Sequence, residues 1–187
     1  MAIDKLRFGL IGCGRVAPNH AQSIAEIANA ELKAVADVVP DRAKNFQNEY
    51  NANPYTDYHE LLAQDEIDVV NICVPSGLHK QVTIDALQAG KHVIVEKPMA
   101  MSVDDANEMI QVAEQAGVKL CVALQNRFNP PMIELYDTVT SGKIGKPLLG
   151  NVTVRWYREQ SYYEDGWHGT LEMDGGAMMN QSIHHID

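Results

Sequence analysis

Short apolar runs alternate with longer segments of helical spacing through most of the chain. The short runs are rich in Val, Ile, Leu and Cys on both faces, which is typical of strands in a parallel sheet with helices on both sides. We expect such strands at residues 7–11, 31–37, 68–74, 92–96 and 119–124. Between them, residues 15–28, 78–89 and 103–116 carry apolar side chains at the spacing of amphipathic helices. This alternation predicts a doubly wound α/β domain.

Helix boundaries in this part of the chain are marked by capping residues. Ser102 precedes Val-Asp-Asp, which is an N-cap followed by acidic residues in the first turn. Gly90 and Gly117 stand where a glycine commonly ends a helix. These residues support the predicted helices.

The pattern changes after residue 125. Asn129-Pro130-Pro131 predicts the start of a short helix that ends near Ser141-Gly142. Residues 151–157 then alternate, with Val and Trp on one face and Thr, Arg and Tyr on the other, which predicts a half-exposed antiparallel strand. We therefore predict one domain at 1–125 and the beginning of an α+β domain at 126–187.

The last segments differ from everything before them. Residues 160–176 are rich in aromatic and polar side chains and are expected to form a loop. Residues 177–187 have a helical pattern that stops without a cap. We expect the natural chain to continue beyond Asp187, so that the second domain is cut short here.

Composition and charge narrow the class of function. The 187 residues include 15 Lys and Arg against 25 Asp and Glu, and the net charge of −10 disfavours nucleic acid or an anionic membrane as a partner. No apolar run approaches the roughly 18 residues of a membrane span, and the N-terminus lacks a signal peptide, so we expect a soluble cytoplasmic protein. Cys13, Cys73 and Cys121 are widely spaced and are interpreted as reduced thiols without a metal.

A glycine-rich turn follows the first predicted strand. Gly12-Cys13-Gly14-Arg15-Val16-Ala17 has the GxGxxA pattern of dinucleotide-binding proteins and opens the first predicted helix. Gly12 permits a tight turn, Gly14 lets backbone amides approach a pyrophosphate, and Ala17 allows close packing of helix on strand. A pyrophosphate would lie at the helix N-terminus, where unpaired amides favour an anion.

An acidic residue ends the second predicted strand. Asp37 lies 37 − 14 = 23 residues after Gly14, where a carboxylate can accept hydrogen bonds from the adenosine ribose. Because it would repel a 2′-phosphate, the sequence favours NAD over NADP, unless Arg42 binds such a phosphate.

A lysine follows the fourth apolar run, in the turn Glu96-Lys97-Pro98. The carboxyl ends of parallel strands face the ligand crevice, so Lys97 is expected to point toward a cofactor and to stabilise a developing alkoxide. Pro98 restricts Lys97 to an extended conformation and allows a cis bond. A solvated lysine at a strand end is the plainer interpretation of this residue alone.

Taken in order, these motifs resemble those of the Gfo/Idh/MocA oxidoreductase family. The resemblance rests on GCGRVA, Asp37, ICVPSGLH at 72–79, VEKP at 95–98, QNRF at 125–128 and DGGAMMNQSIHHID at 174–187. It implies an N-terminal Rossmann domain followed by an α/β domain with an open, mainly antiparallel sheet. The implied NAD-binding residues are Gly12, Cys13, Gly14, Arg15, Val16, Asp37, Val74, Pro75, His79, Glu96, Lys97 and Gln125.

The resemblance also implies a catalytic set of Lys97, His184 and Asn180. In an α-helix, Asn180, His184 and Asp187 would share one face at spacings of four and seven residues. His184 suits the role of general base, because an imidazole can take a hydroxyl proton while hydride leaves the same carbon. Surface histidines at 184 and 185 are compatible with the same spacing. The family needs no metal, so a metal site at these histidines is not expected.

Asn180 stands where many family members have Asp, and this departure narrows the resemblance. Together with RWYREQSYYEDGWHGT at 155–170, it is similar to the WlbA-type branch, which oxidises UDP-N-acetylglucosamine or its uronic acid at C3. The substrate contacts so implied are Lys97, Arg127, Tyr163, Trp167, Asn180 and His184. Arg155 and Tyr162 are further candidates, although such side chains also serve domain packing.

Two alternatives stay open on the sequence. One is a dehydrogenase of the same family that acts on inositol or a free sugar. The other is an NAD-binding module without catalysis. The resemblance further implies a homo-oligomer assembled through the second domain.

Overall fold

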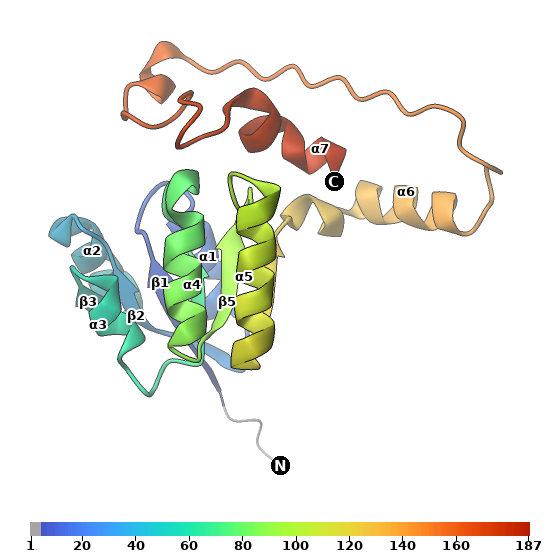
Figure 1. Cartoon of the computed structure of the whole chain (residues 1–187). Coiled ribbons are helices and arrows are strands. Elements are labelled where there is room, and N and C mark those ends of the chain that lie inside the picture. The colour runs from blue at the N-terminus through green and yellow to red at the C-terminus, as the bar shows by residue number, and fades with distance from the viewer. Residues whose placement is uncertain (1–4) are drawn as a thin grey trace. The chain divides into compact units, whose positions relative to one another are not determined.

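The computed structural model describes residues 5–187 (Figure 1). It divides into two compact units, of which the first ends at Val122 and the second spans Ala123–Asp187. The sequence placed the domain boundary at 125/126, close to this division.

The first unit is built on one six-stranded sheet. Neighbouring strands follow the order β3-β2-β1-β4-β5-β6, and β1 is parallel to β2 and β4, β2 to β3, and β4 to β5. The strands are β1 (Leu6–Ile11), β2 (Ala30–Ala36), β3 (Asn53–Tyr55), β4 (Val69–Ile72), β5 (His92–Glu96) and β6 (Leu120–Ala123). The five predicted strands are confirmed. The sixth, β3, has three residues including a proline and is too short to show a periodic pattern.

Helices cover both faces of this sheet. They are α1 (Ala17–Glu26), α2 (Pro40–Tyr50), α3 (Tyr58–Leu62), α4 (His79–Gln88) and α5 (Val103–Ala116), with a 3₁₀ turn η1 (Ser76–Leu78) before α4. The predicted caps are present: the Ser102 hydroxyl accepts the Asp105 N–H at 3.1 Å, and Gly90 and Gly117 have φ of 74° and 68°. The doubly wound α/β prediction is therefore confirmed.

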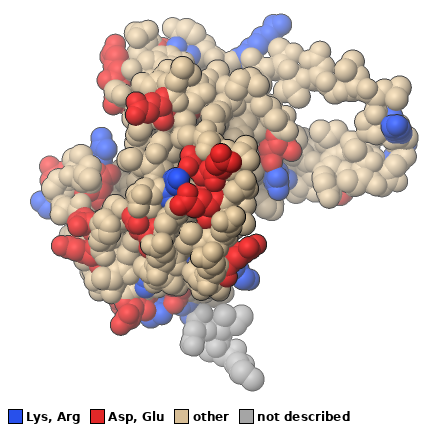
Figure 2. Space-filling view, viewed as in Figure 1, with Lys and Arg blue, Asp and Glu red and all other residues tan. Residues whose placement is uncertain are grey.

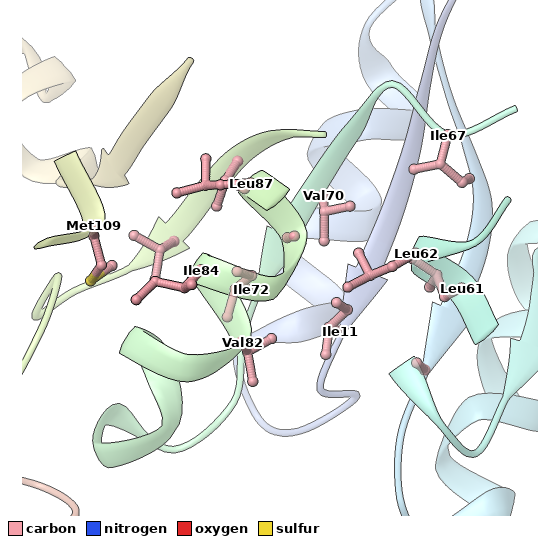
Figure 3. Packing of buried hydrophobic residues seen from close by; sticks show 14 of the residues in the cluster. Ile11, Leu61, Leu62, Ile67, Val70, Ile72, Val82, Ile84, Leu87 and Met109 are labelled. Atoms are coloured by element: carbon pink, nitrogen blue, oxygen red, sulfur yellow. The ribbon is translucent and has the colours of Figure 1, made fainter. Parts of the chain in front are cut away.

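Two apolar cores, one on each face, hold the first unit together. Successive strand residues point to opposite faces, so Leu10 and Ile11 of β1 enter different cores. Figure 3 shows the core beneath α3, α4 and α5, which includes Leu61, Val82 and Met109. The other core packs α1 and α2 on the sheet. Each fully buried aliphatic side chain contributes roughly 1.5–3 kcal/mol, so the sheet is a rigid support for the loops at its edge.

The surface of the first unit is mixed in charge. Lys80 Nζ of α4 lies 2.6 Å from Asp105 Oδ1 and 2.8 Å from Glu108 Oε2 of α5. These ion pairs link the two helices. Figure 2 shows acidic side chains gathered over this face.

The second unit consists of short elements joined by long loops. They are η2 (Gln125–Phe128), α6 (Pro130–Thr140), η3 (Gln160–Tyr163), a π-helix η4 (Met178–Ser182) and α7 (Ile183–Ile186). The predicted short helix after Asn129 is confirmed as α6. Of the helices in the described chain, none combines the length and the apolar character needed to cross a bilayer.

The expected strand at 151–157 is absent, and this prediction was wrong for the described chain. Residues 151–159 have no regular secondary structure. Val152 and Trp156 are 60% and 57% exposed. A strand is defined by hydrogen bonds to a neighbour, and no described segment pairs with this one. The alternating pattern gives this segment the two faces of a strand, but the pattern alone does not provide the neighbouring strand that it needs.

Candidate nucleotide-binding and catalytic site

The turn between β1 and α1 has the geometry that a phosphate cradle needs. Gly12 has φ of 90° and donates its N–H to the Ala36 carbonyl at 2.8 Å. A Cβ at Gly12 would lie 2.7 Å from the Cys73 carbonyl oxygen, so only glycine fits. A Cβ at Gly14 would meet no atom within 4 Å, which leaves open space above the backbone. Ala17, the first residue of α1, is completely buried. The contact of this turn with a pyrophosphate stays a prediction.

Asp37, directly after β2, is fixed by two backbone amides. One carboxylate oxygen accepts the Cys13 N–H and the other accepts the Val39 N–H, each at 2.8 Å. Asp37 is 9% exposed, and these two hydrogen bonds hold its carboxylate beside the glycine turn. Burial, and then the charge of Asp37, raises the pKa of the Cys13 thiol to about 12. Cys13 is therefore a protonated packing residue of this turn at neutral pH.

The residues after β4 are tied to those after β5 by a buried histidine. His79 is 1% exposed; its Nδ1 lies 2.7 Å from the Pro98 carbonyl oxygen and its Nε2 lies 3.0 Å from that of Val74. Burial lowers the pKa of His79. The predicted cofactor residues Val74, Pro75 and His79 thus belong to one hydrogen-bonded loop pair with Pro98.

The Glu96-Lys97-Pro98 turn ends β5, and the Lys97–Pro98 bond is cis, as the sequence allowed. One Glu96 carboxylate oxygen lies 3.0 Å from His20 Nε2, and the other accepts the Lys97 N–H at 3.1 Å. Burial raises the pKa of Glu96, but the hydrogen bond and charge of His20, with Lys97, outweigh it and hold the pKa below its usual value. The Glu96 side chain is engaged within the protein, and its contact with a cofactor stays a prediction.

Two residues at this edge were missed by sequence reasoning. Asn71 of β4 is 4% exposed, and its amide Nδ2 lies 2.9 Å from His20 Nδ1. Both had a signal: an asparagine inside the apolar strand Val69–Ile72, and a histidine on a helix that buries Ala17, Ala21 and Ile24. Buried polar side chains need hydrogen-bond partners. A buried asparagine and a largely buried histidine in neighbouring elements therefore indicate a contact between them.

In the second unit, Asn180 lies in the π-helix η4 and is 8% exposed. The Asn180 amide nitrogen donates to the carboxylate of Asp174 and lies 3.4 Å from the Tyr162 hydroxyl oxygen. The Asp174 carboxylate also accepts the Gly169 N–H at 2.8 Å. The i, i+4 spacing predicted one α-helical face for Asn180 and His184. The π-turn changes this expected geometry, because its hydrogen bonds span five residues.

His184 and Asp187 lie at the last helical turn. The Arg127 Nε donates to Asp187 Oδ2 at 2.6 Å, and its Nη2 contacts the other carboxylate oxygen. The hydrogen bond to Arg127, followed by the charges of Arg127 and His184, lowers the pKa of Asp187. Arg127, predicted as a substrate contact, thus makes a bidentate pair with Asp187.

The aromatic rings of the 160–176 loop contact one another in tilted and edge-to-face arrangements. His168 lies between Tyr162 and Trp167, with ring centroids 4.1 Å and 3.6 Å away, and Tyr163 meets Tyr162 edge to face at 5.0 Å. Arg158 lies 4.8 Å above the Trp156 ring. The predicted contacts Tyr163 and Trp167 belong to this cluster, whereas Arg155 is exposed.

The structure brings most predicted cofactor residues to one edge of the sheet. The glycine turn, Asp37, Val74, Pro75 and Lys97 all follow carboxyl ends of parallel strands, beside the point between β1 and β4 where the strand order reverses. Gln125 is the first residue of η2 and lies in the second unit. The same unit contains the predicted residues at 127, 163, 167, 180 and 184. Within residues 5–187, no group of three His, Cys, Asp or Glu is arranged to hold a metal ion.

The strand order, glycine turn and strand-end acid define the first unit as a Rossmann domain of the dinucleotide-binding class. Residues 6–124 match the oxidoreductase family with an NAD-binding Rossmann fold, and residues 132–187 match the GFO/IDH/MocA C-terminal domain. The chain belongs to the GFO/IDH/MocA oxidoreductase family, as the sequence motifs indicated.

Individual relatives give finer comparisons. The chain is 39% identical to the WlbA dehydrogenase of Chromobacterium violaceum, crystallised with NADH and UDP-GlcNAcA; the TM-score is 0.95, over 100% of this chain and 55% of that one. The WlbA dehydrogenase of Bordetella pertussis was crystallised with the same two ligands. It is 38% identical to this chain with a TM-score of 0.95, and the match covers 100% of this chain and 56% of that one. The myo-inositol 2-dehydrogenase of Thermotoga maritima is 30% identical over 97% of this chain and 53% of its own length. The chain spans about half the length of these relatives.

Proposed function

We propose that this chain forms the cofactor domain and the first part of the catalytic domain of an NAD-dependent sugar-nucleotide 3-dehydrogenase. The substrate is UDP-N-acetylglucosamine or its uronic acid. Hydride leaves C3 for the nicotinamide C4, the C3 hydroxyl loses its proton to a base, and the products are a 3-keto sugar nucleotide and NADH. Such a ketone is the substrate an aminotransferase needs to make a 3-amino sugar.

The observation that carries this proposal is the likeness to the WlbA dehydrogenases. It extends over the whole chain at 38–39% identity and a TM-score of 0.95, and both structures hold NADH and UDP-GlcNAcA. The match includes the loop and helix at 160–187, which contain the proposed base. Likeness in the Rossmann unit alone would support only cofactor binding.

The residues of the first unit fit NAD. Gly12 and Gly14 leave the α1 N-terminus accessible to a pyrophosphate, and Asp37 is held where it would accept ribose hydroxyls and repel a 2′-phosphate. When bound, NAD supplies the hydride acceptor.

The chemical roles follow the charge that develops in the reaction. Lys97 donates a hydrogen bond to the C3 oxygen as it gains negative charge, and His184 accepts the hydroxyl proton. The amide nitrogen of Asn180 donates to Asp174, and its amide oxygen accepts a hydrogen bond from a substrate hydroxyl. Tyr163 and Trp167 flank the sugar nucleotide, and Arg127 acts through its pair with Asp187.

The test is incubation of the full-length protein with NAD and each of three substrates: UDP-GlcNAc, UDP-GlcNAcA and myo-inositol. We expect NADH and a 3-keto product, identified by mass spectrometry after borodeuteride reduction, with one of the sugar nucleotides. A chain with Lys97→Met is the matched blank, because it keeps the glycine turn. Absence of both products with both sugar nucleotides would refute the substrate assignment.

A second candidate is an inositol or free-sugar dehydrogenase. It is favoured by the match to myo-inositol 2-dehydrogenase over 97% of the chain. Turnover of myo-inositol without turnover of either sugar nucleotide would select it. NAD binding by calorimetry without turnover of any substrate would instead select a binding module. Assembly as a homo-oligomer and a cytoplasmic location stay predictions.

A further inference from the structure

We propose that His20 is a positioning residue for Lys97 and acts on it through Glu96. This inference rests on the proposed function, in which Lys97 polarises the substrate oxygen. His20 belongs to α1 and lies 76 residues before Glu96 in the chain. Neither the glycine motif nor the Glu96-Lys97-Pro98 motif includes it.

The contact between His20 and Glu96 is built into the interior of the first unit. The side chains of His20 and Glu96 are each 11% exposed, and the His20 Nε2 lies 3.0 Å from Glu96 Oε1. A hydrogen bond that is shielded from water in this way constrains both partners more than a surface contact would. Glu96 therefore has one carboxylate oxygen fixed by α1.

Asn71 contacts the other ring nitrogen of His20. The Asn71 amide Nδ2 lies 2.9 Å from His20 Nδ1. In this amide orientation a neutral His20 accepts at Nδ1 and carries its ring proton on Nε2. That proton faces the Glu96 carboxylate. The amide nitrogen of Asn71, which is 4% exposed in an otherwise apolar strand, thus favours the tautomer in which His20 donates to Glu96.

The second oxygen of Glu96 carries the constraint to Lys97. Glu96 Oε2 accepts the backbone N–H of Lys97 at 3.1 Å. If His20 were removed, the carboxylate would lose one of these two bonds and could turn about its side-chain torsions. The Lys97 backbone would then lose a fixed acceptor at the residue that carries the proposed catalytic ammonium.

The network joins the elements that build the cofactor edge. His20 follows the glycine turn by one helical turn, Asn71 lies in β4 and Glu96 ends β5. A hydrogen-bonded chain through these three elements sets the register between the phosphate-binding helix and the lysine turn. Misplacement of a reacting group by about 1 Å can cost on the order of 100-fold in rate.

The experiment compares three variants of the full-length protein. His20→Phe keeps a ring of similar volume and removes both hydrogen bonds. His20→Gln keeps a donor for Glu96. His59→Gln is the control, because His59 also pairs with a carboxylate but is 62% exposed on α3. We expect His20→Phe to lower kcat roughly 10- to 100-fold while the Kd for NAD changes by no more than about twofold. His20→Gln restores most of kcat, and the control behaves as wild type.

A double-mutant cycle with Glu96→Gln tests the route through Glu96. The amide has one acceptor oxygen and cannot serve both His20 and the Lys97 N–H. We expect His20→Phe to add little loss of kcat once Glu96→Gln is present. Additive losses would overturn the proposal, as would equal losses in His20→Phe and His20→Gln.

Hydrogen exchange at the Lys97 amide gives a readout that does not depend on turnover. Measured by NMR, it should be slow in the wild type, at least roughly tenfold faster in His20→Phe, and unchanged in His59→Gln. Unchanged exchange in His20→Phe would overturn the link between His20 and Lys97. Faster exchange in a protein that turns over none of the three substrates would support the link and refute the proposed function.

Discussion

The two units position their candidate functional groups by different means. In the first unit, Gly12, Asp37 and Lys97 follow strands whose side chains form two buried apolar cores. Both buried clusters found in the described chain lie in this unit. In the second unit, Asn180 contacts the side chains of Asp174 and Tyr162, and Asp187 forms a bidentate pair with Arg127. A buried sheet, together with hydrogen bonds to Asp37 and Glu96, supports the first set of groups, whereas the contacts described for the second set are side-chain hydrogen bonds.

This difference has a consequence for tolerance to change. A loop on a packed sheet keeps its geometry when one exposed side chain is replaced, because the core is unaffected. A group held by side-chain hydrogen bonds loses part of its support when one partner is removed. We therefore expect the first unit to tolerate changes at exposed side chains but to be sensitive at backbone positions and at the buried His20–Glu96 pair. The second unit should be sensitive at its paired side chains.

The largest expected effect tests whether catalysis takes one group from each unit. Lys97→Met and His184→Ala should each lower kcat by roughly 10²–10⁴-fold, because an oxyanion donor or a general base is lost. The Kd for NAD should stay close to wild type in both. Rates come from NADH formation and Kd from calorimetry, with the exposed Lys119→Met as a control. Full activity of His184→Ala would place the chemistry in the first unit alone.

Gly12→Ala and Gly14→Ala separate a structural glycine from a binding one. At Gly12 the added Cβ meets the Cys73 carbonyl at 2.7 Å and φ is 90°, so the free energy of unfolding should fall by roughly 2–4 kcal/mol. At Gly14 the Cβ meets nothing, so stability should change by less than about 0.5 kcal/mol while NAD binding weakens. Urea unfolding and calorimetry measure the two effects. Equal loss of stability in both variants would contradict the assignment.

Asn180→Asp probes the polar pairing of the second unit. Two carboxylates in contact at Asp174 and residue 180 repel, so the variant should be destabilised by roughly 1–3 kcal/mol at neutral pH. The penalty should grow as the pH rises above about 3.9, where an aspartate ionises in the unfolded chain while repulsion opposes a second charge in the fold. The swap Asp174→Asn with Asn180→Asp restores an amide beside a carboxylate and should recover stability. Thermal melts at several pH values show whether the swap rescues the single variant.

The smallest effect is expected from a polar pair on the sheet of the first unit. Asp68 accepts three hydrogen bonds from Arg7, at 2.6 to 2.9 Å, and the side-chain bond to Arg7 lowers the pKa of Asp68. A carboxyl whose pKa is lowered by folding stabilises the fold at pH values above its unfolded pKa. This stabilisation is lost as the pH falls through the pKa of the folded state. Asp68→Asn should therefore lower the melting temperature slightly at neutral pH. The difference from wild type should begin to shrink as the pH falls below about 3.9, and it should vanish only below the lowered pKa of folded Asp68. A large loss at neutral pH would show that polar contacts matter as much in this unit as in the second.

The sequence predicted the first unit well because its signals are local. Apolar runs, capping residues and the glycine turn each depend on neighbours in the chain, and burial on both faces leaves a continuous Val and Ile pattern. The short strand β3 escaped because it has three residues. His20 and Asn71 escaped because their contact joins residues 51 apart and has no periodic signature.

The second unit was predicted less well for a physical reason. The alternating segment at 151–157 has the side chains of a strand, but a strand also needs a partner for its backbone. The spacing of Asn180 and His184 predicted one α-helical face, whereas the chain forms a π-turn there. The contacts of Asn180 with Asp174 and of Arg127 with Asp187 depend on tertiary packing, which spacing does not encode.

The two amides that bind Asp37 limit how the nucleotide preference of this fold could be redesigned. Removing the carboxylate to admit a 2′-phosphate would also leave the buried Cys13 N–H without its acceptor and release the Val39 end of the following loop. A replacement by Asn or Ser keeps an oxygen for one amide, whereas Ala or Gly keeps none. Cofactor exchange in this turn is therefore a problem of loop architecture as well as of charge.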